Sequence, residues 1–243
     1  MLVQPLPRAI LLDAGFTLTF CDGTRIAPLA AAAGVTVSPE AIERAENAAR
    51  REIARYVWAA TREQSATMKG PGGPGFFLRL LEAAGALGTT AQLAAAADAI
   101  WTGHLQRNVW ARVGAGVDAA MARLRAAGIR MAVVSNSEGT IEATLREIGL
   151  GRHLDTVVDS WIVGVAKPDP RIFRLALDRL GVAADDALMV GDTPAADIDG
   201  ARAAGIRAVL IDPLDLHPAA TVPRVPDLPA LVTALLGPNA TGP

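Results

Sequence analysis

The sequence has 243 residues and a formal net charge of −2 at pH 7, a balance that argues against a dedicated nucleic-acid-binding protein. About half of the residues, 51%, are hydrophobic, which suffices for one large domain or for a domain with a sizeable insertion. Cys21 is the only cysteine, so no intramolecular disulfide can form. No secretory leader precedes Arg8 and no apolar run reaches the ~20 residues of a membrane-spanning helix, so we expect a soluble cytoplasmic protein without a membrane partner.

The apolar run at residues 9–12 predicts the first strand. Isoleucine and leucine without a polar break are typical of a strand that is buried on both faces. Asp13 ends this run, and the carboxyl ends of strands are where open α/β sheets bind ligands. Gly15 lets the backbone turn there and approach a ligand closely. On this stretch alone, a buried aspartate that caps a turn is an equally good interpretation.

Residues 22–112 carry helical patterns and loops but no strand pattern. The second helix has the clearest start, with Ser38 at the N-cap position and Pro39 as its first residue. A loop rich in glycine and proline follows at residues 69–75. The helices predicted in this region span residues 26–33, 39–62, 76–84 and 90–107. We therefore expect residues 22–112 to form a helical insertion.

From Val117 onward, predicted helices alternate with predicted strands. The helices span residues 117–127, 140–148, 170–180, 194–204 and 228–236, and the strands span residues 131–134, 156–158, 187–190 and 207–211. This alternation implies an α/β fold with a doubly wound parallel sheet, for which we assume the strand order 3-2-1-4-5. The expected core domain comprises residues 1–21 and 113–243, with residues 22–112 inserted as a second domain.

Polar residues follow three of the predicted strands. If the strand order holds, Asp13, Ser135 and Asp192 converge on one crevice, because the carboxyl ends of parallel strands share one edge. Lys167 precedes Pro168 in a loop that can reach the same crevice. Asp197 adds a second carboxylate in the first turn of the helix after Asp192.

Each of these residue types has a chemical use in a shared cleft. Carboxylates that meet in a cleft repel one another unless a cation intervenes, and Mg²⁺ prefers such oxygen ligands. A lysine and a hydroxyl group supply donors for phosphate oxygens, and a carboxylate aimed at phosphorus can attack it. Helix N-capping accounts for one of Asp192 and Asp197 but not for both. Taken singly, Ser135 is more typical of a helix cap, and Lys167 is more typical of a solvated surface. The chain has only two lysines, which makes a lysine at this position more informative.

The four stretches resemble, in order and spacing, the motifs of the haloacid dehalogenase superfamily, most of whose members are phosphatases. The resemblance runs from about Arg8 to Asp212, and the motif residues are Asp13 with Thr17 and Leu18, Ser135, Lys167 in Lys-Pro-Asp-Pro, and Asp192 with Asp197. The insertion resembles the helical first-type cap of this superfamily. The resemblance implies a hydrolase that acts on a small phosphorylated metabolite through an aspartyl-phosphate intermediate.

The resemblance also implies a role for each site residue. Asp13 would be the nucleophile. Asp13, Asp192 and the backbone carbonyl of Gly15 would bind Mg²⁺, with Asp197 behind them. The residues that would contact the phosphate are Thr17, Ser135, Asn136 and Lys167.

Gly15 departs from the pattern of the superfamily's phosphatases, which usually carry a second aspartate two positions after the nucleophile. That aspartate protonates the leaving oxygen and later activates water, and the loss of a general acid–base costs about 10²–10⁴ in rate. The substrate can have a good leaving group, as an acyl phosphate does. Alternatively, the cap or the substrate supplies the proton, or the phosphoenzyme is hydrolysed slowly.

Three other functions remain open from the sequence. A metal-free dehalogenase is disfavoured because the acidic pair Asp192 and Asp197 is intact. A phosphonate-cleaving enzyme would need a cap lysine for a Schiff base, and Lys69 is the only candidate. A non-catalytic binding or regulatory protein that retains the fold is compatible with Gly15. The sequence makes no prediction of oligomeric state.

Overall fold

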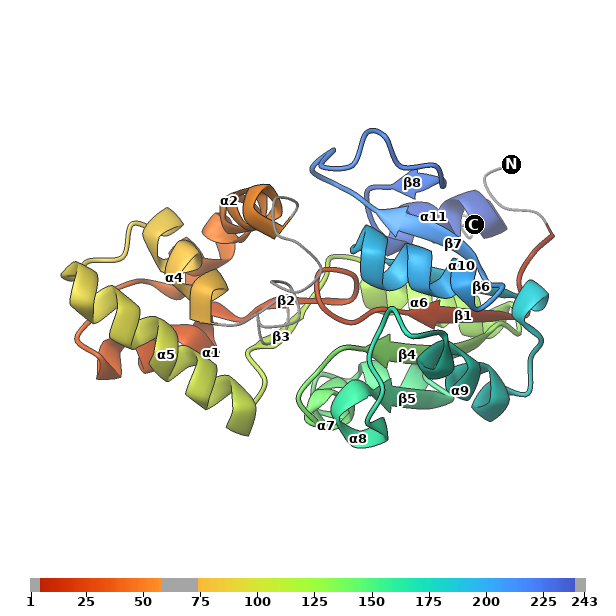
Figure 1. Cartoon of the computed structure of the whole chain (residues 1–243), viewed down its shortest axis with the longest axis horizontal. Helices are drawn as coiled ribbons and strands as arrows, with labels where there is room; N and C mark the ends of the chain where they lie inside the picture. Colours follow the sequence, from red (N-terminus) through yellow and green to blue (C-terminus); the bar gives the residue numbers. More distant parts are fainter. Residues whose placement is uncertain (1–4, 58–73, 239–243) are drawn as a thin grey trace, which may run out of the picture. The chain divides into compact units, whose positions relative to one another are not determined.

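The computed structural model describes residues 5–57 and 74–238, which fall into two compact units (Figure 1). One unit comprises the chain up to Phe20 and from Val113 onward, and the other comprises Cys21–Arg112. Lys69 and Arg62, with most of the predicted glycine–proline loop, lie outside the described residues. Within the described ranges, no helix is both long and apolar enough to cross a membrane.

The first unit is built on a six-stranded sheet in the order β5-β4-β1-β6-β7-β8, and every neighbouring pair of strands is parallel. Its strands are β1 (Ala9–Leu12), β4 (Arg130–Ser135), β5 (Thr156–Asp159), β6 (Ala187–Gly191), β7 (Arg207–Ile211) and β8 (Arg224–Val225). The five strands expected from the sequence take the order 3-2-1-4-5, which confirms the predicted doubly wound fold. The short strand β8, which the sequence analysis missed, extends the sheet beside β7.

Helices cover both faces of this sheet, and the apolar side chains of β1 alternate between the two faces. Ile10 and Leu12 belong to a buried cluster with residues of α6 and α11, whereas Ala9 and Leu11 belong to one with residues of α9 and α10 (Figure 1). The longer helices are α6 (Val117–Ala126), α7 (Ile141–Glu147), α9 (Pro170–Leu180) and α11 (Leu228–Leu236), and the short ones are α8 (Ser160–Val163) and α10 (Gly200–Ala203). Single 3₁₀ turns lie at Leu150–His153 and Ala184–Asp186.

The single helix predicted at residues 194–204 is wrong in detail. The chain forms a π-helical turn at Pro194–Asp199 and then the short helix α10. Thr193 closes the start of this turn from both directions, because its carbonyl accepts from Asp197 N at 2.8 Å and its N–H donates to Asp197 Oδ2 at 2.9 Å. The wider turn thereby directs the Asp197 carboxylate back toward the end of β6.

The second unit is mainly helical, with α1 (Gly23–Ala32), α2 (Pro39–Val57), α4 (Pro74–Ala83) and α5 (Thr90–Gln106). One apolar residue or more from each helix is fully buried, among them Ile26, Ile42, Phe77 and Ile100. Thr89 starts α5 with a capping box that it shares with Gln92. The helices expected in this region are therefore present in the described part of the chain.

The prediction of no strand in this region is wrong at its borders. Strands β2 (Thr19–Cys21) and β3 (Trp110–Val113) pair as a two-stranded sheet, through which the chain passes from one unit to the other and back. Strand β2 ends at Cys21 and is followed directly by α1, with Asp22 as the N-cap. Neither strand was expected because polar side chains interrupt both, Thr19 in β2 and Arg112 in β3, so no unbroken apolar run marks them.

Candidate active site

Asp13 lies at the carboxyl edge of the sheet, directly after β1. Leu12 is in register with Val133 of β4 on one side and with Val190 of β6 on the other. The N–H of Asp13 continues the ladder by donating to Val190 O at 2.9 Å. The carboxyl ends of β4 and β6 therefore lie beside Asp13, as the assumed strand order requires.

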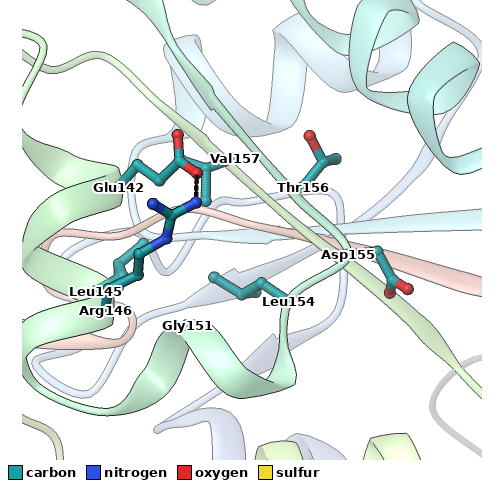
Figure 2. Close-up of a pocket in the computed structure, with 8 residues that line it drawn as sticks. All are labelled: Glu142, Leu145, Arg146, Gly151, Leu154, Asp155, Thr156 and Val157. Atoms are coloured by element: carbon teal, nitrogen blue, oxygen red, sulfur yellow. Dashed lines mark hydrogen bonds and ion pairs between the residues drawn. The ribbon is translucent and has the colours of Figure 1, made fainter.

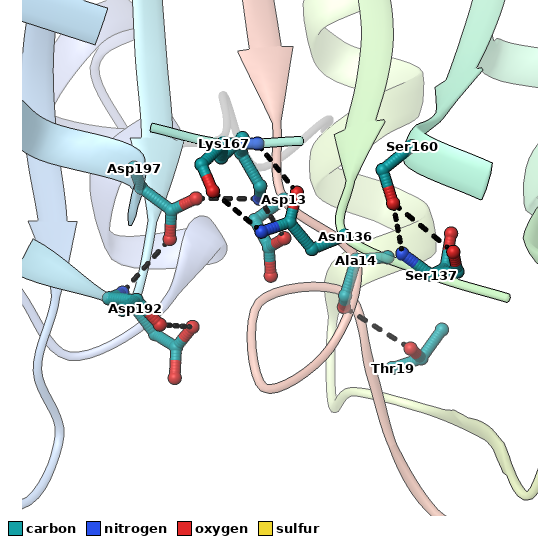
Figure 3. Close-up of polar contacts among 10 residues, drawn as sticks. Asp13, Ala14, Thr19, Asn136, Ser137, Ser160, Lys167, Asp192 and Asp197 are labelled. Carbon is teal, nitrogen blue, oxygen red and sulfur yellow. Dashed lines mark hydrogen bonds and ion pairs between the residues drawn. The ribbon is translucent and has the colours of Figure 1, made fainter. Parts of the chain in front are cut away.

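Lys167 joins two carboxylates at this edge. Its Nζ donates to Asp13 Oδ1 at 2.5 Å and to Asp197 Oδ1 at 2.6 Å (Figure 3). The lysine side chain is only 3% exposed, and Asp197 is 1% exposed. A charge buried to this degree requires paired, hydrogen-bonded partners, and the two aspartates supply them.

Lys167 lowers the pKa of Asp13, and Asp13 raises the pKa of Lys167. Burial raises the pKa of Asp13 to about 7, Lys167 opposes this, and Asp197 and Asp192 add to it by repulsion. Burial disfavours the charged form of Lys167, yet the charges of Asp13 and Asp197 raise its pKa. Lys167 therefore stays an ammonium group and holds Asp13 closer to ionisation than burial alone would.

A third carboxylate completes the cluster. One oxygen each from Asp13, Asp192 and Asp197 lie within 4.8 Å of one another. Three carboxylates face one nearby lysine, so the ionised cluster carries more negative than positive charge. Hard carboxylate oxygens at this spacing are the donors that Mg²⁺ prefers.

Two of the residues predicted to contact phosphate, Ser135 and Thr17, are buried, carry hydroxyl groups and lie at the same end of the unit. Ser135 is the last residue of β4 and is buried. Thr17 lies in the loop after β1, and its Oγ1 is buried with no hydrogen-bond partner among the described residues. An unpaired buried hydroxyl is costly unless a ligand or water satisfies it.

Asn136, also predicted to contact phosphate, uses its side-chain amide on the main chain of Lys167. Its Nδ2 donates to Lys167 O at 2.9 Å, and its Oδ1 accepts from Lys167 N at 2.7 Å (Figure 3). The amide thus bridges the end of β4 and the loop that carries the lysine.

Gly15 has open space around the position of a side chain's first atom. A Cβ built on Gly15 would have no heavy atom within 4 Å, and its φ is not positive. The backbone there is bridged to Thr19, and Thr19 Oγ1 also donates to Ala14 O at 3.2 Å (Figure 3). A Cβ atom at position 15 would therefore meet no steric barrier.

A family model described as haloacid dehalogenase-like hydrolase matches residues 7–205. The chain belongs to the haloacid dehalogenase-like hydrolase family. The match spans both borders of the inserted helical unit and all four motif stretches of this hydrolase.

Two curated relatives illustrate the similarity. Phosphoserine phosphatase of Thermus thermophilus is 44% identical over 96 residues, which cover 39% of this chain and 39% of that protein. Phosphoglycolate phosphatase of Cupriavidus necator is 35% identical over 188 residues, which cover 70% of this chain and 78% of that protein. The chain spans less than half the length of the first curated relatives that it matches, 39% and 47% for two of them.

A solved structure supports the fold of this hydrolase over nearly its whole length. A HAD hydrolase of Bacillus subtilis, crystallised bound to magnesium, has a TM-score of 0.64 with 20% identity, covering 96% of this chain and 100% of that one. Because the identity is low, this likeness concerns the fold alone.

Sequence reasoning missed the residues that hold the loop after β4 in this hydrolase. Ser160 Oγ accepts from Ser137 N at 3.1 Å and donates to Ser137 O at 3.2 Å (Figure 3). Asp159 Oδ2 accepts from Gly139 N at 3.0 Å. Short polar side chains directly after a strand were a signal for such contacts, but their partners are distant in sequence.

A small cavity of about 100 Å³ lies elsewhere on the first unit, between α7 and the edge strand β5 (Figure 2). Glu142 and Arg146, which line it, form an exposed ion pair at 2.6 Å. None of the predicted site residues lines this cavity. The candidate active site is therefore the carboxylate cluster and not this cavity.

Proposed function

We propose that this hydrolase is a Mg²⁺-dependent phosphatase that acts on a small phosphorylated metabolite through an aspartyl-phosphate on Asp13. The observation that carries the proposal is the buried contact of Lys167 Nζ with Asp13 and Asp197, beside the third carboxylate of Asp192. Such a cluster needs additional positive charge, and it has one strongly perturbed carboxylate at its centre. The phosphatases among the curated relatives support the same reaction class.

The donor set fits Mg²⁺. Asp13 and Asp192 would hold the ion, with the Gly15 carbonyl as a further oxygen ligand and Asp197 orienting the site. When bound, Mg²⁺ supplies positive charge that offsets the charge of the phosphate oxygens. The ammonium group of Lys167 would likewise supply positive charge and a hydrogen-bond donor to the phosphate. Ser135 and the unpaired hydroxyl of Thr17 would also hydrogen-bond to the phosphate.

The protein's own part in the reaction has two steps. In the first, a carboxylate oxygen of Asp13 attacks phosphorus, the bond from phosphorus to the leaving oxygen breaks, and that oxygen takes up a proton. In the second, the oxygen of a water molecule attacks phosphorus, the bond to Asp13 breaks, and inorganic phosphate leaves, while the water releases one proton that balances the proton taken up in the first step. One water is consumed and the Asp13 carboxylate is restored. Lys167 favours the ionised Asp13 that the first step needs.

Gly15 limits which substrates react quickly. No side chain at this position can protonate the leaving oxygen or activate water. A substrate whose leaving group needs no proton, such as an acyl phosphate, avoids the first loss. The other possibilities are a proton from the substrate or from the inserted unit, which we propose is the substrate-selecting cap, or a slowly hydrolysed phosphoenzyme.

Turnover assays test this proposal. We expect Mg²⁺-dependent release of phosphate from acetyl phosphate, slower release from p-nitrophenyl phosphate, loss of both with EDTA, and no turnover by Asp13→Asn. Activity that survives EDTA would favour a metal-free dehalogenase-type enzyme. No turnover across a broad panel of phosphate esters would favour a binding protein, the second candidate that Gly15 supports.

A further inference from the structure

The side chain of Asn136 pairs with one residue of the loop that carries the catalytic lysine. It accepts from the N–H of Lys167 at 2.7 Å and donates to the carbonyl of the same residue at 2.9 Å. The primary amide thus satisfies both main-chain groups of Lys167, as a neighbouring strand would. Both bonds lie in a partly buried region where an unpaired backbone group would be costly.

The neighbouring residues make Lys167 dependent on these two bonds. Pro168 follows directly and has no N–H to donate. The nearest main-chain bond of the loop joins Asp169 N to Ala166 O at 3.0 Å and so passes over Lys167 without holding it. Asn136 is therefore the described side chain whose hydrogen bonds fix the backbone of Lys167.

We propose that Asn136 is a positioning residue that acts through Lys167 and is not a direct ligand of the substrate phosphate. The two bonds fix the plane of the Asn136 amide against the loop and hold the lysine backbone where Nζ reaches both Asp13 and Asp197. Without them the loop can move, and Nζ loses its placement between the two carboxylates. The inference rests on the proposed phosphatase function only for its kinetic test.

A double-mutant cycle provides the kinetic test. We expect Asn136→Ala to lower kcat/KM by about 10–100-fold, in the range for residues that orient a site's ligands. In the Lys167→Met background, the same substitution should change kcat/KM by less than about twofold, because its route to the reaction is already removed. A full additional loss in that background would overturn the inference and indicate a direct contact with the phosphate.

Amine labelling tests the same inference without any enzymatic activity, so failure of the proposed function is distinguishable from failure of this one. The chain has two lysines, Lys69 and Lys167, which acetylation with mass spectrometry reports separately. We expect Lys167 to be protected in the wild type and to react about tenfold faster in Asn136→Ala, with Lys69 as the internal reference. Unchanged protection of Lys167 in a folded variant would overturn the inference.

Two further variants keep the result interpretable. Asp155→Ala is the control, because it removes a side chain that accepts a hydrogen bond from Met131 N at 2.8 Å at the opposite end of the same sheet. This variant should leave Lys167 protected. Asn136→Asp keeps the acceptor for Lys167 N and loses the donor for Lys167 O. It should give intermediate labelling, and it replaces Asn136→Ala if circular dichroism shows that the latter does not fold.

Discussion

The two units each contain a buried cluster of charges, and the clusters differ in how their charges balance. In the helical unit, Glu46 accepts from Cys21 N at 2.7 Å and pairs with Arg112 at 2.8 Å. Arg112 Nε in turn donates to Cys21 O at 3.0 Å. In the sheet unit, Lys167 Nζ donates to the carboxylates of Asp13 and Asp197 and, among the described residues, to no main-chain group.

This difference separates a structural cluster from a candidate catalytic one. Burial raises the pKa of Glu46, while Cys21 and Arg112 lower it, and burial also raises the pKa of Asp13. A perturbed carboxylate is thus present in both units and does not by itself identify the active site. In the sheet unit three carboxylates gather close enough to share a cation. In the helical unit Arg112 pairs with Glu43 at 3.4 Å as well as with Glu46, and these charges hold the backbone of β2.

We expect Gly15→Asp to produce the largest change in activity. It adds a carboxylate that can act as a general acid–base beside a cluster that already has a surplus of carboxylates. A Cβ at position 15 meets no heavy atom within 4 Å, and a general acid–base contributes about 10²–10⁴ in rate. We expect kcat for alkyl phosphate esters to rise within that range and kcat for acetyl phosphate to rise much less. Steady-state kinetics measure both.

Gly15→Asn is the matched control, because it has the same size and cannot transfer a proton in the same way. An equal gain in the asparagine variant would show that the added side chain acts by packing. No gain in either variant would show that the missing acid–base is not what limits turnover.

Lys167→Met removes the positive charge that offsets the sheet-unit cluster. We expect kcat/KM to fall by about 10²–10³-fold, the usual loss for one electrostatic donor. The metal-free protein should lose about 3–5 kcal/mol of unfolding free energy, because two buried carboxylates are left facing each other. Urea unfolding with and without Mg²⁺ measures this loss, which the ion should reduce. A loss that Mg²⁺ leaves unchanged would contradict a shared cation site.

The fold was predictable because its signals are local and long. The apolar runs of β1 and β6 and the helices between strands are readable from periodicity, and these elements determine a doubly wound parallel sheet. Strands β2, β3 and β8 each contain a polar residue and lack such an apolar run, and they form because distant segments pair. The π-helical turn at Asp197 was expected as plain helix because the hydrogen bonds with Thr193 that close it are not readable from the residue pattern.

The candidate site was predictable only at the level of which residues share an edge. Asp13 and Asp192 were expected there because strand ends meet at one edge, and Lys167 because its loop can reach that edge. The structure does bring the three together. The partner of the Asn136 amide was not predictable from the sequence. The same amide could bind either phosphate or the main chain of the loop that carries Lys167, about 30 residues away. Their roles in catalysis remain predictions that the variants test.

Gly191→Ala tests the geometry of the sheet-unit cluster without changing its charge. A Cβ on Gly191 would lie 2.3 Å from Asp197 Oδ2, a contact so close that the carboxylate must move. We expect Mg²⁺ affinity to fall by about 10–100-fold, as measured by isothermal titration calorimetry. Gly75→Ala is the control, since no heavy atom lies within 4 Å of the added methyl group. Unchanged affinity would show that Asp197 does not orient the ion.

Glu46→Gln should have the smallest effect, and it is confined to the helical unit's cluster. The glutamine keeps an acceptor for Cys21 N but sets an amide donor against Arg112, which costs about 1–3 kcal/mol for a buried group left unpaired. Thermal unfolding should show this loss of stability, while the stabilisation added by Mg²⁺ stays as in the wild type. A smaller Mg²⁺ effect in Glu46→Gln would mean that the two clusters are coupled, and the separation between structural and catalytic charges would then fail.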